Sequence, residues 1–392
     1  MDTPSPAFII DLEKLAANCA LLAEVKAAAS CHIVHALKAF ALPQAFPVMQ
    51  EHLDGCCASG PWEAQLAHLH FGKHILTCAP AYTSADLDTL LPLSTHLDFN
   101  SPGQWNRFRD QVMAHPRFQS GELRCGLRIN PRCSTGPNPL YDPCAPGSRL
   151  GCPPELIGEA NLEGLSGLHF HTLCEQNSDD LERTLEAVDQ HFGHLLRSPQ
   201  FRYLNMGGGH WITKPDYDRD LLIRLVRQTY QRYDLDEIWL EPGEAAVVHT
   251  GILAATVLDL FPSGDLQVAL LDVSATAHMP DVLEMPYRPD LTRADGSPAA
   301  DPGHYEHTYR LGGPSCLAGD VIGDFSFQSP LQIGDRLHFQ DMAQYTMVKT
   351  TLFNGVRHPA YVLKHPDGRL ETVREFHYDD FASKLGVPPN TI

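Results

Sequence analysis

The sequence lacks the features of a membrane or secreted protein. No apolar run approaches the ~20 residues that cross a bilayer, and residues 1–6 hold no basic stretch followed by an apolar core, so we expect no secretory signal. The eleven cysteines show no repeated CxxC spacing, which favours free thiols in a reducing cytoplasm over a disulfide scaffold or a zinc site. We therefore expect a cytoplasmic protein without a membrane partner.

Basic side chains are scarce. The 29 Lys and Arg residues stand against 48 Asp and Glu residues, and the net charge is −19. Because this charge repels polyanions, we expect no nucleic-acid partner. A cationic substrate would suit it, although acidity for solubility is the commoner explanation. The sequence also has no internal repeat and no Gly/Ser linker, and its 392 residues are enough for two domains.

Strand-like runs alternate with amphipathic helices in the first part of the chain. After a short strand at Ala7–Ile10 and a helix from Asp11 to about Ala29, the runs are 32–40, Leu53–Ala58, His74–Ala79, Thr95–Phe99, Leu123–Asn130, Leu165–His171, Arg202–Met206 and Glu237–Glu241. The helices between them include Pro61–Leu69, Ser84–Leu91, Pro102–Met113, Ser178–Leu196 and Pro215–Tyr233. Eight strands in such alternation are typical of a parallel (β/α)₈ barrel, and we predict an α/β fold with this barrel over 11–252.

The remaining residues have a different texture. From about Leu253, strand runs are separated by turn signals such as Ser263-Gly264-Asp265 and Pro366-Asp367-Gly368. This pattern predicts an antiparallel β domain. We expect residues 1–10 and 253–392 to form it, as a sandwich or barrel-like sheet that completes the active site.

Lys38 leaves the carboxyl end of the first barrel strand. A lysine in apolar surroundings loses proton affinity, and its neutral amine can condense with a carbonyl to form a Schiff base. Judged from this stretch alone, a lysine at a strand end that reaches solvent is commoner than a lysine that forms a Schiff base. Barrel enzymes, however, place functional groups at the carboxyl ends of their strands, and the residues found there are Lys38, Arg128, Asn130, His171, Gly207, Gly208, Gly209, Glu241 and Glu244.

These residue types suit a site for pyridoxal phosphate. The three glycines let backbone N–H groups approach a phosphate, and Glu241 could hold the pyridine nitrogen protonated so that the ring accepts electrons. A tight structural loop and a buried ion pair are the ordinary alternatives. His169 and His171 alternate on one strand, but no third ligand is suitably spaced, so we expect no metal. Cys316 lies in a glycine-rich turn, where a cysteine is more often packed than catalytic.

The order of the motifs HALK, GLHFH, NMGGG, EPGE, GGPSC and AQYT resembles the fold-type III pyridoxal-phosphate decarboxylases, which include ornithine, diaminopimelate and arginine decarboxylases. The resemblance spans nearly the whole chain. Within that group, the segments FHTLCE, LNMGGGHWITKPDYD and HMPDVLEMPYRP are similar to the carboxynorspermidine/carboxyspermidine decarboxylases.

The resemblance implies roles for individual residues. Lys38 would form the Schiff base with the cofactor, His171 would stack on its ring and Glu241 would meet its nitrogen. Gly207–Gly209 and the Tyr345 hydroxyl would hold the phosphate, and Arg128 would organise the surrounding polar groups. Cys316 and Asp320 would reach into the site of the neighbouring subunit of a homodimer, with Cys316 the leading candidate for returning a proton to Cα.

Two departures from the group bear on the substrate. Where the ornithine-type enzymes have a phosphate-binding arginine after EPG, this chain has Glu244. Together with Asp281, Glu244 could bind the ammonium groups of a carboxylated triamine, although surface loop carboxylates are the ordinary interpretation. Relatives that use diaminopimelate have an acidic residue after the catalytic cysteine, whereas Leu317 follows Cys316 here.

The implied reaction converts carboxynorspermidine to norspermidine and carboxyspermidine to spermidine, in polyamine biosynthesis. Three alternatives remain at this point. A diaminopimelate decarboxylase would share almost every cofactor residue but differs at Leu317. A racemase of the same barrel family needs a second base, which the sequence does not reveal. A regulatory homologue without cofactor would not need Lys38, Glu241, Cys316 and Tyr345 together.

Overall fold

The computed structural model describes residues 4–136, 138–158 and 160–388. The chain forms two compact units. The barrel unit comprises 16–38 and 42–246, and the sheet unit comprises the described parts of 1–15, 39–41 and 247–392. Each unit has its own sheet.

Eight parallel strand positions make up the described sheet of the barrel unit. The first is split at Val34 into β2 (His32–Ile33) and β3 (His35–Ala36). The others are β4 (Gly55–Ala58), β5 (His74–Cys78), β6 (His96–Phe99), β7 (Arg124–Arg128), β8 (Gly167–His169), β9 (Tyr203–Asn205) and β10 (Glu237–Leu240). Because β2 pairs with β10 while β3 pairs with β4, the split strand closes the ring. The predicted barrel is confirmed.

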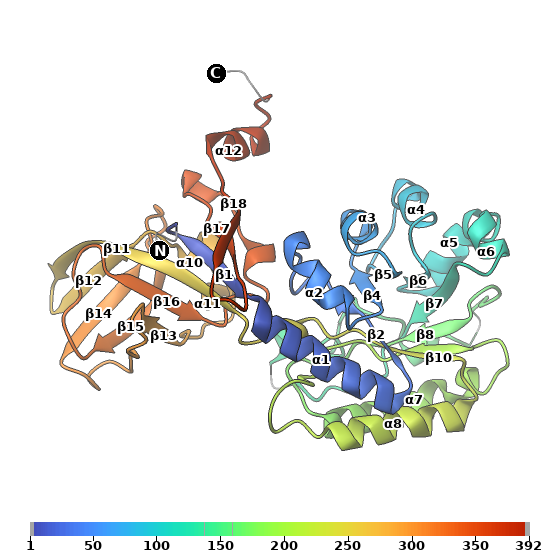
Figure 1. The fold of residues 1–392 in the computed structure, drawn as a ribbon. Coiled ribbons are helices and arrows are strands. Elements are labelled where there is room, and N and C mark those ends of the chain that lie inside the picture. Colours follow the sequence, from blue (N-terminus) through green and yellow to red (C-terminus); the bar gives the residue numbers. More distant parts are fainter. Residues whose placement is uncertain (1–3, 137, 159, 389–392) are drawn as a thin grey trace. The chain divides into compact units, whose positions relative to one another are not determined.

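Helices surround these strands (Figure 1). They are α2 (Phe46–Gln50), α3 (Pro61–His70), α4 (Ser84–Leu90), α5 (Pro102–Met113), α6 (Pro116–Gln119), α7 (Ser178–Leu196), α8 (Arg219–Tyr233) and α9 (Glu244–Val247), with α1 (Leu12–Ala29) before the first barrel strand. The helix predicted from Pro215 begins only at Arg219, because the Asp218 side chain caps it by accepting the Leu221 N–H. Among the helices described, none is both long and apolar enough to cross a bilayer.

The sheet unit is built on a mixed sheet. Its strands are β1 (Ala7–Asp11), β11 (Gly251–Ser263), β12 (Leu266–Leu271), β13 (Leu291–Arg293), β14 (His307–Gly312), β15 (Val321–Phe327), β16 (Arg336–Gln340), β17 (Ala360–Lys364) and β18 (Leu370–Arg374). Most pairs are antiparallel as predicted, but β1 runs parallel to β17 and β12 to β14. Parallel neighbours need long connections, and both pairs are joined through other elements. Its helices are α10 (Ala275–His278), α11 (Asp281–Glu284) and α12 (Tyr378–Lys384).

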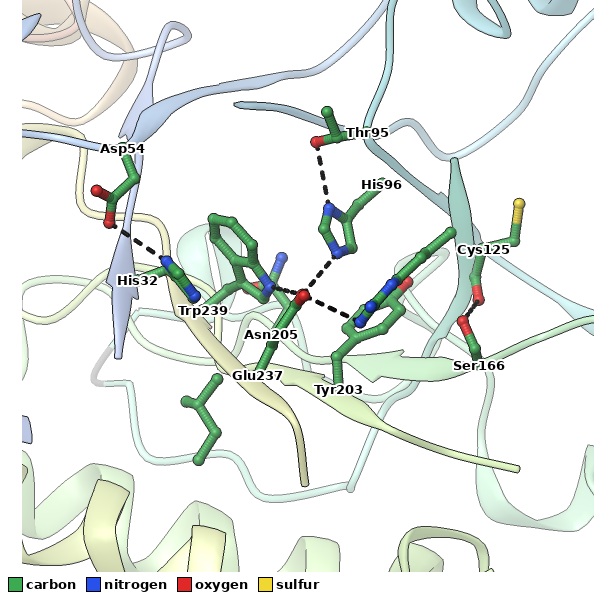
Figure 2. A network of polar contacts seen from close by, with 12 residues as sticks. His32, Asp54, Thr95, His96, Cys125, Ser166, Tyr203, Asn205, Glu237 and Trp239 are labelled. Carbon is green, nitrogen blue, oxygen red and sulfur yellow. Dashed lines mark hydrogen bonds and ion pairs between the residues drawn. The ribbon is translucent and has the colours of Figure 1, made fainter. Parts of the chain in front are cut away.

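The amino ends of the barrel strands carry a polar cluster, which we call the barrel floor: His96, Glu237, Trp239 and Arg124. Figure 2 shows the His96 ring and the Trp239 indole converging on the Glu237 carboxylate. His96 Nε2 lies 3.0 Å from Glu237 Oε2, Trp239 Nε1 donates to the same oxygen at 2.9 Å, and Arg124 approaches the other oxygen at 2.9 Å. Burial alone would raise the pKa of Glu237, but these partners outweigh it and lower the pKa to about 2.

Glu237→Gln is expected to destabilise the protein by roughly 1–3 kcal/mol at pH 7, because charge-assisted hydrogen bonds are lost in a half-buried site. The pKa of Glu237 is lower in the folded chain, so its stabilising effect is complete above pH 4.5 and is lost as the pH falls towards 2. Urea unfolding at several pH values measures both effects. Glu24→Gln, on an exposed position of α1, is the control, and an equal loss in both variants would contradict the prediction.

Candidate functional site

The predicted site residues of the barrel unit lie at the carboxyl ends of neighbouring strands and are linked by contacts. Lys38 follows β3, and its Nζ lies 3.4 Å from Nε2 of His171, which follows β8. Nδ1 of His171 accepts the Gly208 N–H at 3.0 Å. The Gly207 carbonyl, in the same glycine turn, accepts the Glu241 N–H at 2.7 Å. The rim is therefore one connected group.

The hydrogen bond from Gly208 fixes the tautomer of His171. A backbone N–H can only donate, so Nδ1 must be an acceptor and a neutral ring carries its hydrogen on Nε2. The ring is neutral, because burial and the charges of Lys38 and Arg128 hold the pKa of His171 well below its usual value. Nε2–H therefore points at the Lys38 amine. An amine condenses with a carbonyl in its neutral form, and the neutral imidazole places no second positive charge beside Lys38.

The glycine turn is shaped by close backbone contacts. A Cβ on Gly208 would lie 2.2 Å from the Glu241 carbonyl oxygen, and one on Gly209 would lie 1.8 Å from the Leu173 carbonyl oxygen. Gly209 also has a φ of +83°. No other residue fits here. The N–H groups of Gly207 and Gly208 donate to Asn205 and His171, so a phosphate would be held by other donors of the turn, and the phosphate role stays a prediction.

Glu241 is held from below by buried side chains. Its Oε1 accepts Asn205 Nδ2 at 2.6 Å, and its Oε2 lies 3.6 Å from His169 Nε2. The other nitrogen of His169 lies 3.1 Å from Asp98 Oδ2. His169 therefore lies between two carboxylates, while His171 faces Lys38. Among the described residues, no group of His, Cys, Asp and Glu is arranged to hold a metal.

Arg128 and Glu244 are two further residues of the predicted rim. The positive charge of Arg128 acts on His171. The Cys174 thiol has its pKa raised to about 11, chiefly by burial and then by Glu175 and Glu244, while Lys38 opposes the shift. Glu244 begins α9 directly after β10, so it lies at the carboxyl end of a barrel strand, as Lys38 does after β3.

The other predicted residues belong to the sheet unit. Cys316 is exposed, and its N–H donates to Asn354 Oδ1 at 2.6 Å. Asp320 is buried, and its Oδ2 accepts Ser274 Oγ at 2.8 Å and the Ser315 N–H at 3.2 Å, so within its own unit it holds the turn that carries Cys316. Tyr345 has a positive φ of 48° and donates its N–H to the Ala39 carbonyl, directly after Lys38 in the sequence.

Asp281 begins α11 and forms an ion pair with Lys349, which also contacts Glu284 at 2.6 Å. Burial would lower the pKa of Lys349, but the two carboxylates outweigh it and raise that pKa. The sequence did not indicate this partner, because Lys349 is distant in the chain. A cationic ligand at Asp281 would compete with it.

Comparison with known proteins decides the family. The family model described as "Pyridoxal-dependent decarboxylase, C-terminal sheet domain" matches residues 8–343. The chain belongs to the pyridoxal-dependent decarboxylases. A carboxyaminopropylagmatine decarboxylase from Synechocystis is 43% identical over 98% of this chain and 96% of its own length. A carboxynorspermidine/carboxyspermidine decarboxylase from Campylobacter jejuni is 38% identical over 96% of this chain and 97% of its own length.

A solved structure agrees with this family. The crystal structure of carboxynorspermidine decarboxylase complexed with norspermidine, from Campylobacter jejuni, matches with a TM-score of 0.86 and 36% identity. The match covers 97% of this chain and 100% of that chain. The two-part fold of the family is therefore the fold of this chain.

The rim fits the cofactor of the family on its own chemistry. A lysine amine beside a neutral imidazole can form the Schiff base. The glycine turn links His171 to Glu241 at the rim, and a carboxylate fixed by Asn205 suits a protonated ring nitrogen. The assignment of each residue to its part of the cofactor is the prediction made from the sequence, which we carry forward as a proposal.

Proposed function

We propose that this chain removes carbon dioxide from carboxynorspermidine and carboxyspermidine to give norspermidine and spermidine. The observation that carries the proposal is Glu244, a carboxylate that begins α9 directly after β10 and so lies at the same end of the barrel strands as Lys38. An anion at this rim suits an amino acid with a cationic arm. The names of the Campylobacter relative and of its norspermidine complex support this substrate class.

The residues of the rim divide the work. Lys38 would hold pyridoxal phosphate covalently through its Nζ. Pyridoxal phosphate, when bound, supplies the electron sink that makes loss of carboxylate possible. Glu241 would keep the ring nitrogen protonated, and the neutral ring of His171, whose Nδ1 accepts the Gly208 N–H, would stack on the cofactor ring. Arg128 would organise the polar groups around His171, and Tyr345 and the turn Gly207–Gly209 would hold the phosphate, through donors other than the Gly207 and Gly208 N–H groups.

The sheet unit completes the proposal. Cys316 returns a proton to Cα, and its exposed thiol is available to a neighbouring subunit. We propose a homodimer in which Cys316 and Asp320 complete the partner's site, with the barrel over 11–252 and the sheet domain over the rest. All eleven cysteines are free thiols in the residues described, which supports a cytoplasmic location.

A second candidate substrate is carboxyaminopropylagmatine. The Synechocystis relative that carries this name is 43% identical, compared with 38% for the Campylobacter relative. Both names describe a carboxylated polyamine, and they differ in the cation at the end of the arm, which is a guanidinium in agmatine. The same carboxylates, Glu244 and Asp281, would face either cation.

The deciding experiment measures carbon dioxide release by the cofactor-loaded protein with carboxynorspermidine, carboxyspermidine, carboxyaminopropylagmatine, meso-diaminopimelate and ornithine in parallel. Turnover of the first two substrates supports the proposal. The highest kcat/KM on carboxyaminopropylagmatine would replace it with the second candidate. Preference for diaminopimelate would refute the role of Glu244, and no release from any substrate would favour a regulatory protein.

Glu244→Gln is expected to raise KM for the preferred carboxylated polyamine by roughly 10- to 100-fold and to change kcat less than about threefold. A charge-assisted contact to the arm is worth about 1.5–3 kcal/mol, and uniform binding appears in KM. Steady-state kinetics measure the change. Glu186→Gln, on an exposed position of α7, is the control, and an unchanged KM in Glu244→Gln would exclude this residue from the substrate site.

A further inference from the structure

A buried chain of polar side chains runs below the rim, from β6 to β10. Tyr203 donates its hydroxyl to Asp98 Oδ1 at 2.8 Å, Asp98 Oδ2 lies 3.1 Å from His169 Nδ1, and His169 Nε2 lies 3.6 Å from Glu241. Asp98 and His169 are 1% and 2% exposed. Neither residue follows a strand, so neither belongs to the predicted rim.

The barrel reserves space for this chain. A Cβ on Gly126 of β7 would lie 2.3 Å from both Asp98 Oδ1 and the Tyr203 hydroxyl oxygen. A Cβ on Gly167 of β8 would lie 2.2 Å from the Tyr203 ring. Glycine inside a strand weakens it, and a close approach of another group explains its presence. Two strands of the barrel thus lack side chains where the Asp98–Tyr203 pair passes.

The charges of these buried side chains must balance, because water does not reach them. Two buried carboxylates close to one imidazole would be costly if the imidazole were neutral, since neither anion would have a counter-charge. Burial alone would lower the pKa of His169, but Glu241, Cys78 and Asp98 outweigh it and raise the pKa to about 10. His169 is therefore an imidazolium at neutral pH, and it shares its charge between Asp98 and Glu241.

We propose that His169, held by Asp98, is a positioning residue that balances the two buried carboxylates and thereby keeps Glu241 charged and oriented towards the cofactor. The inference rests on the proposed role of Glu241 at the ring nitrogen. Asn205 fixes Oε1 of Glu241, and the group that the described residues place beside Oε2 is the His169 ring, at 3.6 Å. Without the imidazolium, one of these two buried carboxylates would take up a proton, and a protonated Glu241 would no longer hold the ring nitrogen protonated.

The test compares His169→Gln with the double variant Asp98→Asn/His169→Gln. In the single variant two buried carboxylates lack their cation, so we expect kcat to fall roughly 10- to 100-fold with KM changed less than about threefold. In the double variant Glu241 is the one carboxylate left among these buried side chains, so no second anion drives it to take up a proton. We expect the double variant to recover at least half of the loss in log kcat. If the substitutions only damaged packing, the losses of the two substitutions would add and kcat would fall further.

A second readout needs no substrate. The protein is loaded with pyridoxal phosphate labelled with ¹⁵N in the ring, and the ¹⁵N chemical shift reports whether that nitrogen is protonated. We expect the signal to move towards the neutral pyridine value in His169→Gln and to return towards the parent value in the double variant. His96→Gln is the matched control, because this buried histidine also faces a carboxylate but lies at the barrel floor. It should match the parent signal.

The outcomes separate the two proposals. The positioning role would be overturned if His169→Gln kept the parent ¹⁵N signal and the parent kcat. It would also be overturned if the double variant were no better than the single one. Either result would leave the proposed reaction intact. A parent protein that binds cofactor but releases carbon dioxide from no carboxylated polyamine would overturn the proposed function, and the ¹⁵N series would still decide the role of His169. A parent protein that binds no cofactor would overturn both.

Discussion

Lys38→Ala is expected to reduce carbon dioxide release by about 10³-fold or more, because the residue that carries the cofactor and frees the product is lost. The variant should still bind pyridoxal phosphate, but without a covalent bond. Borohydride reduction followed by mass spectrometry measures this, since it fixes the cofactor on the parent protein at Lys38 and should leave the variant unlabelled. Both readings rest on the contact between Lys38 Nζ and His171 Nε2 at 3.4 Å.

The matched control for this prediction is Lys14→Ala, on an exposed position of α1. It should release carbon dioxide at the parent rate and be labelled at Lys38. Full activity of Lys38→Ala would refute the Schiff-base role outright. Labelling of a different lysine in the parent would move the reactive group elsewhere in the chain.

Gly209→Ala is expected to destabilise the protein by about 4 kcal/mol or more and to abolish cofactor binding. The new Cβ would lie 1.8 Å from the Leu173 carbonyl oxygen, a backbone atom that cannot turn away, and the φ of +83° is unfavourable for any side chain. Guanidinium unfolding gives the change in the free energy of unfolding. A titration with pyridoxal phosphate, followed by absorbance, gives the change in affinity.

Gly121→Ala separates the effect of the positive φ from the effect of the close contact with Leu173. Gly121 has a φ of +80°, close to that of Gly209, but nothing lies within 4 Å of its Cβ position. The control therefore pays only for the backbone conformation, about 1–2 kcal/mol, and should bind cofactor like the parent. Equal losses in the two variants would show that the close approach to Leu173 has no effect.

The sequence allowed the barrel and its rim to be predicted because both follow from simple periodicities. An apolar run followed by a polar residue marks the end of a parallel strand, and Lys38, His171 and Glu241 all follow such runs. The structure links them through the glycine turn. The antiparallel texture of the second part was also predicted, apart from the two parallel pairs, since nothing local indicates that β1 lies beside β17.

The layer below the rim could not be predicted in the same way. Asp98 and Asn205 belong to strands, where a polar residue gives no sign of its partner. The alternation of His169 with His171 suggests only a possible metal ligand. Asp98 meets Tyr203 across the barrel, although they are far apart in the sequence. The available signal was weaker: Asp98 and Asn205 each have apolar neighbours on both sides, which is unusual for a side chain that must be paired when buried.

Strand β1 has a consequence for how the protein is made. It leaves the ribosome early, but its partners are β11 and β17, and Ala7 lies opposite Ala360. At a synthesis rate of about 5–20 residues per second, β1 waits on the order of 20–70 s for β17. One of its edges is unpaired until β11 has emerged, and the other stays unpaired until β17 follows, while the barrel strands emerge before either partner. We therefore expect the nascent sheet unit to need protection from aggregation, and its assembly to be a post-translational event.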